Sequence, residues 1–363
     1  MRVALTGATG FLGLRLVRAL LERHDSLTVL AHAGSDRALG RITRFMELTG
    51  APPALISELP RRLSIVEIDL RRPRLGLSPD AFRRLADELD VIWHSAGNIN
   101  LDDDLAQLRR VNVEGTRSVL ELAAAGIRRP LVHHIGTAFV GGARREGVVY
   151  EDELDGRHGF ENSYERSKYE AEVLVHEWAR AHGRPVVVMR PSVLVTDLAP
   201  NPELPPHPLQ FLSRIVRASL RSGGLTPGEV PEERRPVVRM AGHPRGHLNL
   251  LPVEHAVSVM TRLASRPPSG RVDVYHVVHD HDVATTVLTA LLERMVPVKV
   301  RLVEKRPEAP GSLEATADLY PGFTPYLSHR RRFDDTRVRN LLGPPASGIR
   351  VDLDYLAAGI DPG

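Results

Sequence analysis

The stretch TGATGFLG (6–13) constrains the fold of this chain more than any other, because it joins an apolar first strand, RVALTG (2–7), directly to a helical pattern. Its glycines stand three residues apart, at Gly7, Gly10 and Gly13. Gly7 would permit a tight turn, Gly10 would let backbone N–H groups approach a diphosphate at the helix N-terminus, and Gly13 would allow close packing of helix on sheet. A strand, this turn and a helix in that order predict a dinucleotide-binding unit.

Short β-branched runs alternate with helical patterns through the first half of the chain. The later runs are SLTVLA (26–31), LSIVEI (63–68), DVIWHSA (90–96), LVHHIGTAFV (131–140) and PVVVMRPS (185–192). Segments between them, such as VNVEGTRSVLELAAA (111–125), place apolar residues three and four apart. This alternation predicts an α/β fold, a Rossmann-like doubly wound parallel sheet with helices on both faces.

The pattern changes after Pro191. Residues 199–250 are rich in proline and glycine around one helical stretch at 209–221, which favours a mobile insertion or lid over the sheet edge. A smaller αβ region is expected next, followed by a Pro-rich tail with two short helices. Its helices are expected near 252–266 and 283–295, and its strands near 272–279 and 297–303. We therefore expect a dinucleotide-binding domain at 1–192 and a substrate-binding region at 193–363, interleaved with the first.

Composition and charge exclude several classes of protein. With 48 basic and 45 acidic residues the net charge is only +3, so we expect no nucleic-acid partner. The basic run HRRRF (329–333) is expected to be solvated or to anchor the tail. The absence of cysteine excludes disulfides and thiolate chemistry. The sequence has no signal-peptide pattern and no apolar run near the ~20 residues of a membrane span, so we expect a cytoplasmic protein.

Polar residues at strand ends extend the predicted dinucleotide site. Asp69 follows the third strand and could accept a hydrogen bond from an adenine amine, and HSAG (94–97) follows the fourth strand. At the end of the second strand, an acidic residue would favour NAD by binding the ribose hydroxyls. The sequence instead carries His32, Arg37 and Arg41 there, with Asp36 further into the loop. This pattern favours NADPH over NADH, unless the arginines are only solvated residues of a helix face.

The segment NSYERSKYEAEVLV (162–175) places Tyr164 and Lys168 one turn apart on one helix face. A phenol with a pKa near ~10 is a poor acid–base catalyst at neutral pH, and a neighbouring cation lowers that pKa. Thr137, near the end of the fifth strand, could hydrogen-bond the same carbonyl. Taken alone, such a spacing is more often a coincidence on an amphipathic helix, so its context decides.

That context resembles a known family. TGATGFLG, HSAG, NVEGT, GTAFVGG and YERSK, in this order, resemble the extended short-chain dehydrogenase/reductases. VNVEGTRSVLELA, EDELDGRHGFENSYERSKYEAE and LNLLPVEHAV are most similar to the branch that includes fatty acyl-CoA reductases and the thioester-reductase domains of carboxylic acid reductases and peptide synthetases. The resemblance is dense over 1–192 and returns at 248–257. It is weaker in the tail, where FTPYLSHRRRFDD (323–335) is similar to the fatty acyl-CoA reductase pattern.

The resemblance implies roles for individual residues. Tyr164 would be the general acid, Lys168 would hold the nicotinamide ribose and tune Tyr164, and Thr137 would orient the substrate carbonyl. Asn112 would help to position the site, although a helix N-terminal hydrogen bond explains it equally well. The expected cofactor-binding residues are Gly7, Thr9, Gly10, Phe11, Leu12, Gly13, His32, Arg41, Asp69, Leu70, Ser95, Ala96, Gly97, Tyr164, Lys168, Pro191 and Val193.

Three positions depart from the family pattern. Thr137 stands where many relatives have serine, which preserves the hydroxyl group. His32 stands where relatives often carry an arginine for the 2′-phosphate, so the prediction of NADPH depends on Arg41. RPSVLVTDLAPNP (190–202) lacks the usual glycine-rich stretch, so we expect a substrate pocket of different shape.

The leading hypothesis is NADPH-dependent reduction of an acyl thioester, on coenzyme A or a carrier protein, to an aldehyde. A second hydride would give the alcohol, which the sequence leaves open. The alternative is a ketoreductase or hydroxysteroid-type dehydrogenase, or a nucleotide-sugar epimerase or dehydratase. Seven arginines could bind either a carrier-protein surface or a diphosphate, namely Arg214, Arg217, Arg221, Arg234, Arg235, Arg239 and Arg245. A third hypothesis, a cofactor sensor without chemistry, is disfavoured by the intact Thr137, Tyr164 and Lys168.

Histidine-rich and acidic segments have simpler interpretations. In HVVHDHD (276–282) the side chains of a strand alternate between faces and Asp280 or Asp282 suits a helix N-cap, so we expect no metal site. LDDDL (101–105) predicts a helix start, where acidic residues favour the helix dipole. His133 and His134 lie within a strand, and at least one is expected to be a buried core histidine with satisfied hydrogen bonds.

Overall fold

Seven parallel strands form the centre of the computed structural model. The structure describes residues 1–32, 35–210, 213, 231–305, 307–309, 311, 314, 322–343 and 348–360. The strands are β1 (Val3–Thr6), β2 (Leu27–Ala31), β3 (Leu63–Glu67), β4 (Val91–His94), β5 (Leu131–Ile135), β7 (Val186–Pro191) and β12 (Val272–Val277). Their order across the sheet is β12-β7-β5-β4-β1-β2-β3. This sheet confirms the predicted Rossmann-like α/β fold. The fifth strand ends earlier than predicted, because a 3-10 turn, η2 (Ala138–Gly141), follows Thr137.

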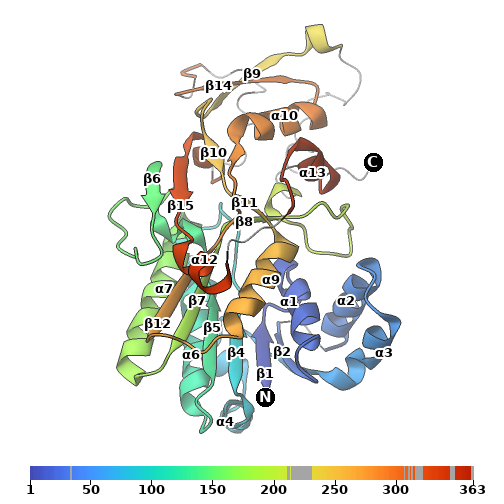
Figure 1. The fold of residues 1–363 in the computed structure, drawn as a ribbon, viewed down its shortest axis with the longest axis vertical. Coiled ribbons are helices and arrows are strands. Elements are labelled where there is room, and N and C mark those ends of the chain that lie inside the picture. The colour runs from blue at the N-terminus through green and yellow to red at the C-terminus, as the bar shows by residue number, and fades with distance from the viewer. Residues whose placement is uncertain are drawn as a thin grey trace.

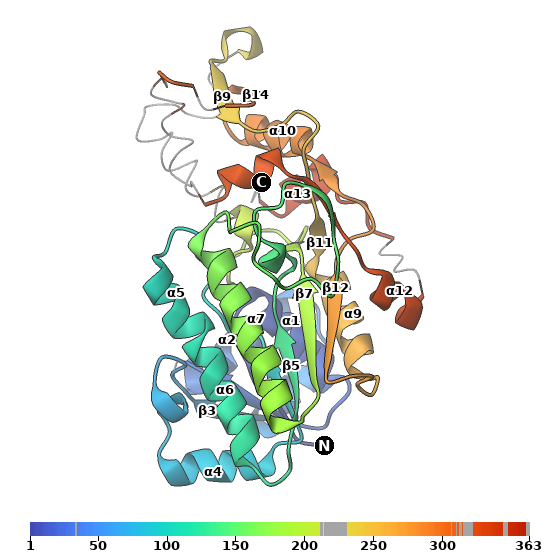
Figure 2. The ribbon, with the colours of Figure 1, turned by 90° about the vertical axis from the view of Figure 1, so that its left-hand side faces the viewer.

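Helices cover both faces of the sheet, as Figures 1 and 2 show. One face carries α1 (Phe11–Leu21), α2 (Ser35–Leu48), α3 (Pro53–Arg62) and α9 (Val253–Ala264). The other carries α4 (Pro79–Glu88), α5 (Leu105–Asn112), α6 (Glu114–Ala125) and α7 (Ser163–His182). The helix predicted at 111–125 is thus divided, since α5 ends at Asn112 and α6 begins at Glu114. The predicted start near LDDDL is confirmed, because Asp104 caps α5 by accepting from the N–H of Gln107.

The strand order reverses between β1 and β4, which are neighbours in the sheet although two strands separate them in the sequence. Open α/β sheets bind ligands at such a point, outside the carboxyl ends of the strands. In Figure 1 these ends point upward, away from the N-terminus. The glycine-rich turn, the loop after β4 and Thr137 all follow strands at this edge.

The region after residue 192 returns to the sheet. The strand near 272–279, expected in a smaller C-terminal region, is β12, which pairs with β7 and forms the edge of the seven-stranded sheet. Helix α9 packs against α1 on one face of the same sheet. These two elements of the region after residue 192 therefore belong to the core of the main sheet. Continuous apolar runs in the sequence do not reveal which strand each of them pairs with.

A cap region lies above the carboxyl ends of the strands in Figure 1. It contains β9 (Val237–Ala241), β10 (His247–Leu248), β13 (Val283–Ala284), α10 (Thr285–Met295), β14 (Lys299–Val303) and α13 (Leu353–Ala358). Strands β9 and β14 pair in parallel, and β8 (Val193–Val195) pairs with β11 (Leu250–Pro252). The helix and the two strands predicted at 283–295, 272–279 and 297–303 are confirmed as elements. The predicted helix at 209–221 lies mostly outside the described residues.

The tail returns to the dinucleotide-binding part of the chain, where it forms a two-stranded sheet with β6 (Glu146–Val149). After η4 (Thr324–Ser328), strand β15 (Arg330–Phe333) pairs in parallel with β6, and α12 (Thr336–Leu342) follows. The run HRRRF therefore anchors the tail, which is one of the two expected outcomes. Among the described residues, no helix combines the length and the apolar character needed to cross a membrane.

Candidate functional site

The glycine-rich turn is held so tightly that two of its glycines tolerate no side chain. Gly7 has φ +73°, and a Cβ atom there would lie 2.7 Å from the backbone nitrogen of Ala96. A Cβ atom on Gly13 would lie 1.8 Å from the carbonyl oxygen of Gly7. Gly10 is less restricted, with 3.3 Å to the same oxygen. The turn therefore brings β1, α1 and the loop after β4 into backbone contact, as a dinucleotide-binding turn requires.

The N-terminus of α1 is suited to an anion. Its N-cap is Gly10, no side chain caps the helix, and its first turn contains no acidic residue. Backbone N–H groups at such an end attract phosphate groups. A shallow pocket adjoins this end and is lined by Phe11, Arg15, Thr196 and Asn201, among others. Together with Thr9 and Leu12, which are only partly buried, these residues form a site that fits the diphosphate of a dinucleotide.

The loop after β4 closes against the same turn. The backbone N–H groups of Ser95 and Ala96 both donate to Oγ1 of Thr6, at 3.2 and 3.1 Å. Gly97 lies beside Asn112, whose Oδ1 atom would be 3.1 Å from a Cβ atom at this glycine. The HSAG motif is thus fixed at the edge where a cofactor would lie.

Asn112 is buried and joins this loop to the helix that carries Tyr164. Its Nδ2 donates to the carbonyl oxygen of Asn98 and to Oγ of Ser167, both at 2.9 Å, and its Oδ1 accepts from the N–H of Asn98 at 2.7 Å. Asn112 is the last residue of α5 and does not cap a helix N-terminus. The alternative of a helix N-terminal hydrogen bond is therefore wrong, and the contacts support a positioning role.

Tyr164, Lys168 and Thr137 gather at the carboxyl end of β5. The Thr137 side chain hydrogen-bonds the Tyr164 phenol, and its Oγ1 atom lies 3.4 Å from the carbonyl oxygen of Pro191. Nζ of the buried Lys168 donates to the carbonyl oxygen of Ile135 at 3.0 Å. β5, β7 and α7 therefore bring together the three residues that were predicted from the sequence. Val193, on β8 shortly after Pro191, is half-buried.

Burial dominates the electrostatics of these groups. It raises the pKa of Tyr164 to about 12, with the Glu165 carboxylate acting in the same direction and the hydrogen bond from Thr137 opposing it. Burial lowers the pKa of Lys168 to about 8, although Glu172 opposes this shift. The pKa of Lys168 thus lies close to neutral pH. The Tyr164 phenol is protonated in the protein without cofactor and can donate a hydrogen bond.

The far end of the expected cofactor site lies at β2 and β3. His32 and Arg41 are both exposed there. Asp69 is engaged by Arg71, whose Nε and Nη2 atoms lie 3.0 and 3.1 Å from the carboxylate oxygens. These hydrogen bonds lower the pKa of Asp69 to about 2. Leu70 packs next to Gly115, where a Cβ atom would lie 3.1 Å away.

Two histidines of the HVVHDHD segment have structural partners. His276 bonds to the carbonyl oxygen of Asp334 through Nδ1 at 2.7 Å, and His279 bonds to that of Ile349 through Nε2 at 3.0 Å. No group of three or more potential metal ligands occurs within the described ranges. His133 and His134 are both buried, as expected for one at least. Both ring nitrogens of His134 lack a hydrogen-bond partner among the described residues, so the expectation of a satisfied histidine was wrong for this one.

Only some of the arginines expected to bind a carrier protein or a diphosphate lie among the described residues. Arg214, Arg217 and Arg221 lie outside the described residues. Arg239, on β9, is paired with Glu314 at 2.6 Å. Arg234 and Arg245 lie near the same region, at η3 (Glu232–Arg234) and between β9 and β10, and Arg235 follows η3.

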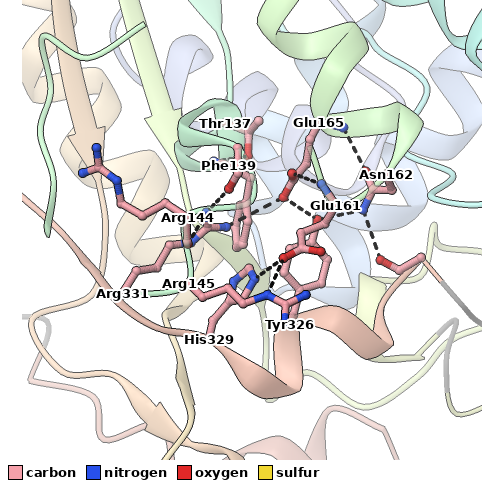
Figure 3. Close-up of polar contacts among 12 residues, drawn as sticks. Thr137, Phe139, Arg144, Arg145, Glu161, Asn162, Glu165, Tyr326, His329 and Arg331 are labelled. Atoms are coloured by element: carbon pink, nitrogen blue, oxygen red, sulfur yellow. Dashed lines mark hydrogen bonds and ion pairs between the residues drawn. The ribbon is translucent and has the colours of Figure 1, made fainter. Parts of the chain in front are cut away.

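Sequence reasoning missed the residues that surround the start of α7. Glu165 is fully buried next to Tyr164, and Arg331 and Tyr326 reach it from the tail (Figure 3). One signal was present, namely a charged residue directly after the expected general acid. Its partner, more than 160 residues away, could not be found from spacing.

Comparison with known proteins agrees with this geometry. Residues 5–260 match the NAD-binding family described as male sterility protein. The isonitrile lipopeptide synthase of Mycobacterium tuberculosis is 31% identical over 299 residues, which cover 77% of this chain and 12% of the synthase. The carboxylic acid reductase of the same organism is 29% identical over 298 residues, covering 77% of this chain and 24% of that protein. The chain thus spans less than a quarter of the length of these curated relatives.

A solved structure extends the likeness over almost the whole chain. The terminal R domain from the myxalamid PKS-NRPS biosynthetic pathway has a TM-score of 0.74 at 25% identity, covering 99% of this chain and 89% of that one. The family match spans more than half of the sequence and includes the glycine-rich turn, Thr137, Tyr164 and Lys168. The chain therefore belongs to the male sterility protein family, NAD-binding oxidoreductases of the extended short-chain dehydrogenase/reductase type.

Proposed function

We propose that this protein reduces an acyl thioester, carried on coenzyme A or on a carrier protein, to an aldehyde, and with a second hydride to the alcohol. The observation that carries the proposal is the cluster of Thr137, Tyr164 and Lys168 at the carboxyl end of β5, beside the glycine-rich turn. The named activities of the relatives support the substrate class, since one is a carboxylic acid reductase and another a lipopeptide synthase.

The residues present fit a nicotinamide dinucleotide, which when bound supplies the hydride. Gly7, Gly10 and Gly13 with the N-terminus of α1 would hold its diphosphate. Lys168 would hold the nicotinamide ribose. His32 directly follows β2 and is exposed, and Arg41 is exposed on α2, whereas the acidic Asp36 lies in the first turn of that helix. We therefore infer a preference for NADPH over NADH.

The side chains of the site would act on the carbonyl oxygen. Thr137 and Tyr164 would donate hydrogen bonds to this oxygen as negative charge develops on it, and Tyr164 would deliver a proton. The resulting hemithioacetal breaks its C–S bond, so that the thiol leaves with a proton and the aldehyde is released. Pro191 and Asn112 would act indirectly, by holding Thr137 and the helix that carries Tyr164.

We also propose that two regions of the chain bind the dinucleotide and the substrate separately. Residues 1–192 would bind the dinucleotide and carry the catalytic helix, and residues 193–363 would bind the substrate, with α9 and β12 packed into the first part. The cap region lies over the carboxyl ends of the strands, on the side where the acyl chain and its carrier would enter (Figure 1).

The proposal is tested by offering the purified protein NADPH and then NADH with panels of acyl-CoA, acyl-carrier protein, ketones and nucleotide sugars, with products identified by mass spectrometry. Aldehyde or alcohol formed from thioesters, with NADPH preferred, is the expected result. Tyr164→Phe should abolish turnover and leave NADPH binding intact. Reduction of ketones without any consumption of thioesters would contradict the proposal.

A further inference from the structure

The carboxylate of Glu165 is an unusual group to find directly after a general acid. It is fully buried, it accepts from the N–H of Glu161 at 2.9 Å through Oε2, and it accepts from the hydroxyl of Tyr326 at 2.8 Å through Oε1. Asn162 caps α7 by accepting from the N–H of Glu165 at 2.9 Å. This pattern resembles a capping box, in which a glutamate three residues after the N-cap reaches back to the start of the helix.

A capping glutamate has no need of burial. Removing a carboxylate from water costs several kcal/mol unless a cation and hydrogen bonds compensate it. Here the cation comes from the tail, since Nη2 of Arg331 lies 3.7 Å from Oε1 of Glu165 and both side chains are almost completely buried. Figure 3 shows the guanidinium directed from β15 towards the start of α7. Capping alone therefore does not explain this arrangement.

Arg331 also contacts the turn that follows Thr137. Its guanidinium lies over the rings of Phe139 and Phe333, 5.1 and 5.5 Å from their centres, and it donates to the carbonyl oxygens of Gly142 and Arg144. Phe139 belongs to η2, and its backbone N–H donates to Oγ1 of Thr137 at 3.3 Å. One side chain of the tail thus touches the segments that carry both proposed hydrogen-bond donors.

We propose that the buried ion pair of Arg331 and Glu165 is a positioning device for Tyr164, through which the C-terminal strand β15 controls the acidity of the phenol. The proposal rests on the proposed role of Tyr164 as general acid. Neither residue touches the substrate carbonyl; Glu165 acts through its charge beside the phenol, and Arg331 acts by compensating that charge and by holding η2.

Several other charged or titratable groups face this pair. Glu161 lies on the same helix start and is paired with His329 at 2.9 Å and Arg145 at 3.3 Å. Tyr326 donates to Glu165, and Arg144 lies beside Arg331. Burial raises the pKa of Glu165, and Arg331 is the strongest influence opposing that rise. The charge on Glu165 in turn raises the pKa of Tyr164.

This coupling has a distinctive consequence for Arg331→Gln. Without the cation the pKa of Glu165 rises further, so its carboxylate should become protonated at a higher pH than in the wild type. At a pH below its pKa, Glu165 is neutral. At a pH above its pKa, an uncompensated negative charge lies beside Tyr164 and makes the phenol a weaker acid. We expect a new ionisation in the profile of kcat against pH, with a fall of about tenfold on its alkaline side.

The test compares the kcat profiles of the wild type, Arg331→Gln, Glu165→Gln and the double variant. Arg332→Gln is the matched control, since this neighbour on β15 is 77% exposed. The new ionisation should appear in Arg331→Gln, disappear in the double variant and be absent from the control. A wild-type profile for Arg331→Gln would overturn the proposal, as would a new ionisation that persists in the double variant.

Glu165→Gln keeps the proposal testable if Arg331→Gln does not fold. Loss of the negative charge should lower the pKa of Tyr164, so the alkaline limb of the profile should move to lower pH by about one unit; an unmoved limb would overturn the proposal. Phenolate absorbance, measured against each protein's Tyr164→Phe counterpart, gives the same comparison without turnover. If Tyr164→Phe were fully active, the proposed role of Tyr164 as general acid would be wrong, while the phenolate titration would still decide whether Glu165 and Tyr164 are coupled.

Discussion

Arg190 of β7 and Glu172 of α7 form an ion pair without exposed surface, with 2.6 Å between Nη2 and Oε1. Nη1 of the same guanidinium contacts His276 at 3.3 Å, and Nη2 donates to the carbonyl oxygen of Glu153 at 3.1 Å. The pair therefore connects α7, the sheet and the loop before α7.

Arg190→Met should strongly destabilise the fold, because it leaves the Glu172 carboxylate buried without its cation. We expect a loss of about 3 to 5 kcal/mol in the free energy of unfolding, measured by urea denaturation. Arg109→Met is the control, since its ion pair with Glu170 is equally short but partly exposed; this variant should lose less than about 1 kcal/mol. Equal losses in both variants would contradict the assignment.

Gly13→Ala should prevent correct closure of the glycine-rich turn, since the added methyl group would collide with the carbonyl oxygen of Gly7. We expect NADPH binding, measured by cofactor fluorescence, to be lost, together with a lower melting temperature. Gly40→Ala is the matched helical control, because nothing lies within 4 Å of its added Cβ atom. That variant should bind normally and gain up to about 1 kcal/mol of stability.

Two replacements of Thr137 should separate the effect of its hydroxyl group on kcat from the effect of its volume. Thr137→Val removes one proposed donor to the carbonyl oxygen, and kcat should fall by about 100-fold while the Kd of NADPH is unchanged. Thr137→Ser keeps the hydroxyl and should retain most of the activity. If the serine variant were as impaired as the valine variant, the methyl group would be the important part of this side chain.

Arg41→Ala should change cofactor preference. If Arg41 pairs with a 2′-phosphate, its loss should raise the KM for NADPH about tenfold and leave the KM for NADH unchanged. Arg61→Ala, which removes a highly exposed arginine on α3, serves as the control for net charge. An equal effect on both cofactors would show that Arg41 does not distinguish them.

Glu151 should make stability depend on pH. Burial raises its pKa from 4.5 to about 7, so the folded protein binds more protons than the unfolded chain between these values. Stability contributed by the neutral acid is therefore present at low pH and lost as the pH rises to about 7. The unfolding free energy of the wild type, relative to Glu151→Gln, should fall by about 2 kcal/mol between about pH 5 and about pH 8. A constant difference would show that Glu151 is ionised throughout.

Local patterns predicted much of the fold and part of the candidate site. Alternating runs identified the strands, and the glycine spacing identified a turn in which Gly7 and Gly13 are sterically required. Long-range pairing could not be read in this way. The partner of β15 is β6, 184 residues earlier at the Arg330–Glu146 position, and only the folded chain shows that Arg331 is buried beside Glu165.

The position of β12 at the edge of the main sheet determines where this chain can be cut. The matched family region ends at residue 260, before β12 begins at Val272. A recombinant piece with those limits would leave the buried strand β7 as an open edge, with unpaired backbone groups along Val186–Pro191. Such edges promote association between chains. Reductase modules of this kind should therefore be excised beyond β12, and beyond β15 wherever Glu165 of α7 is to keep Arg331 as its buried charge partner.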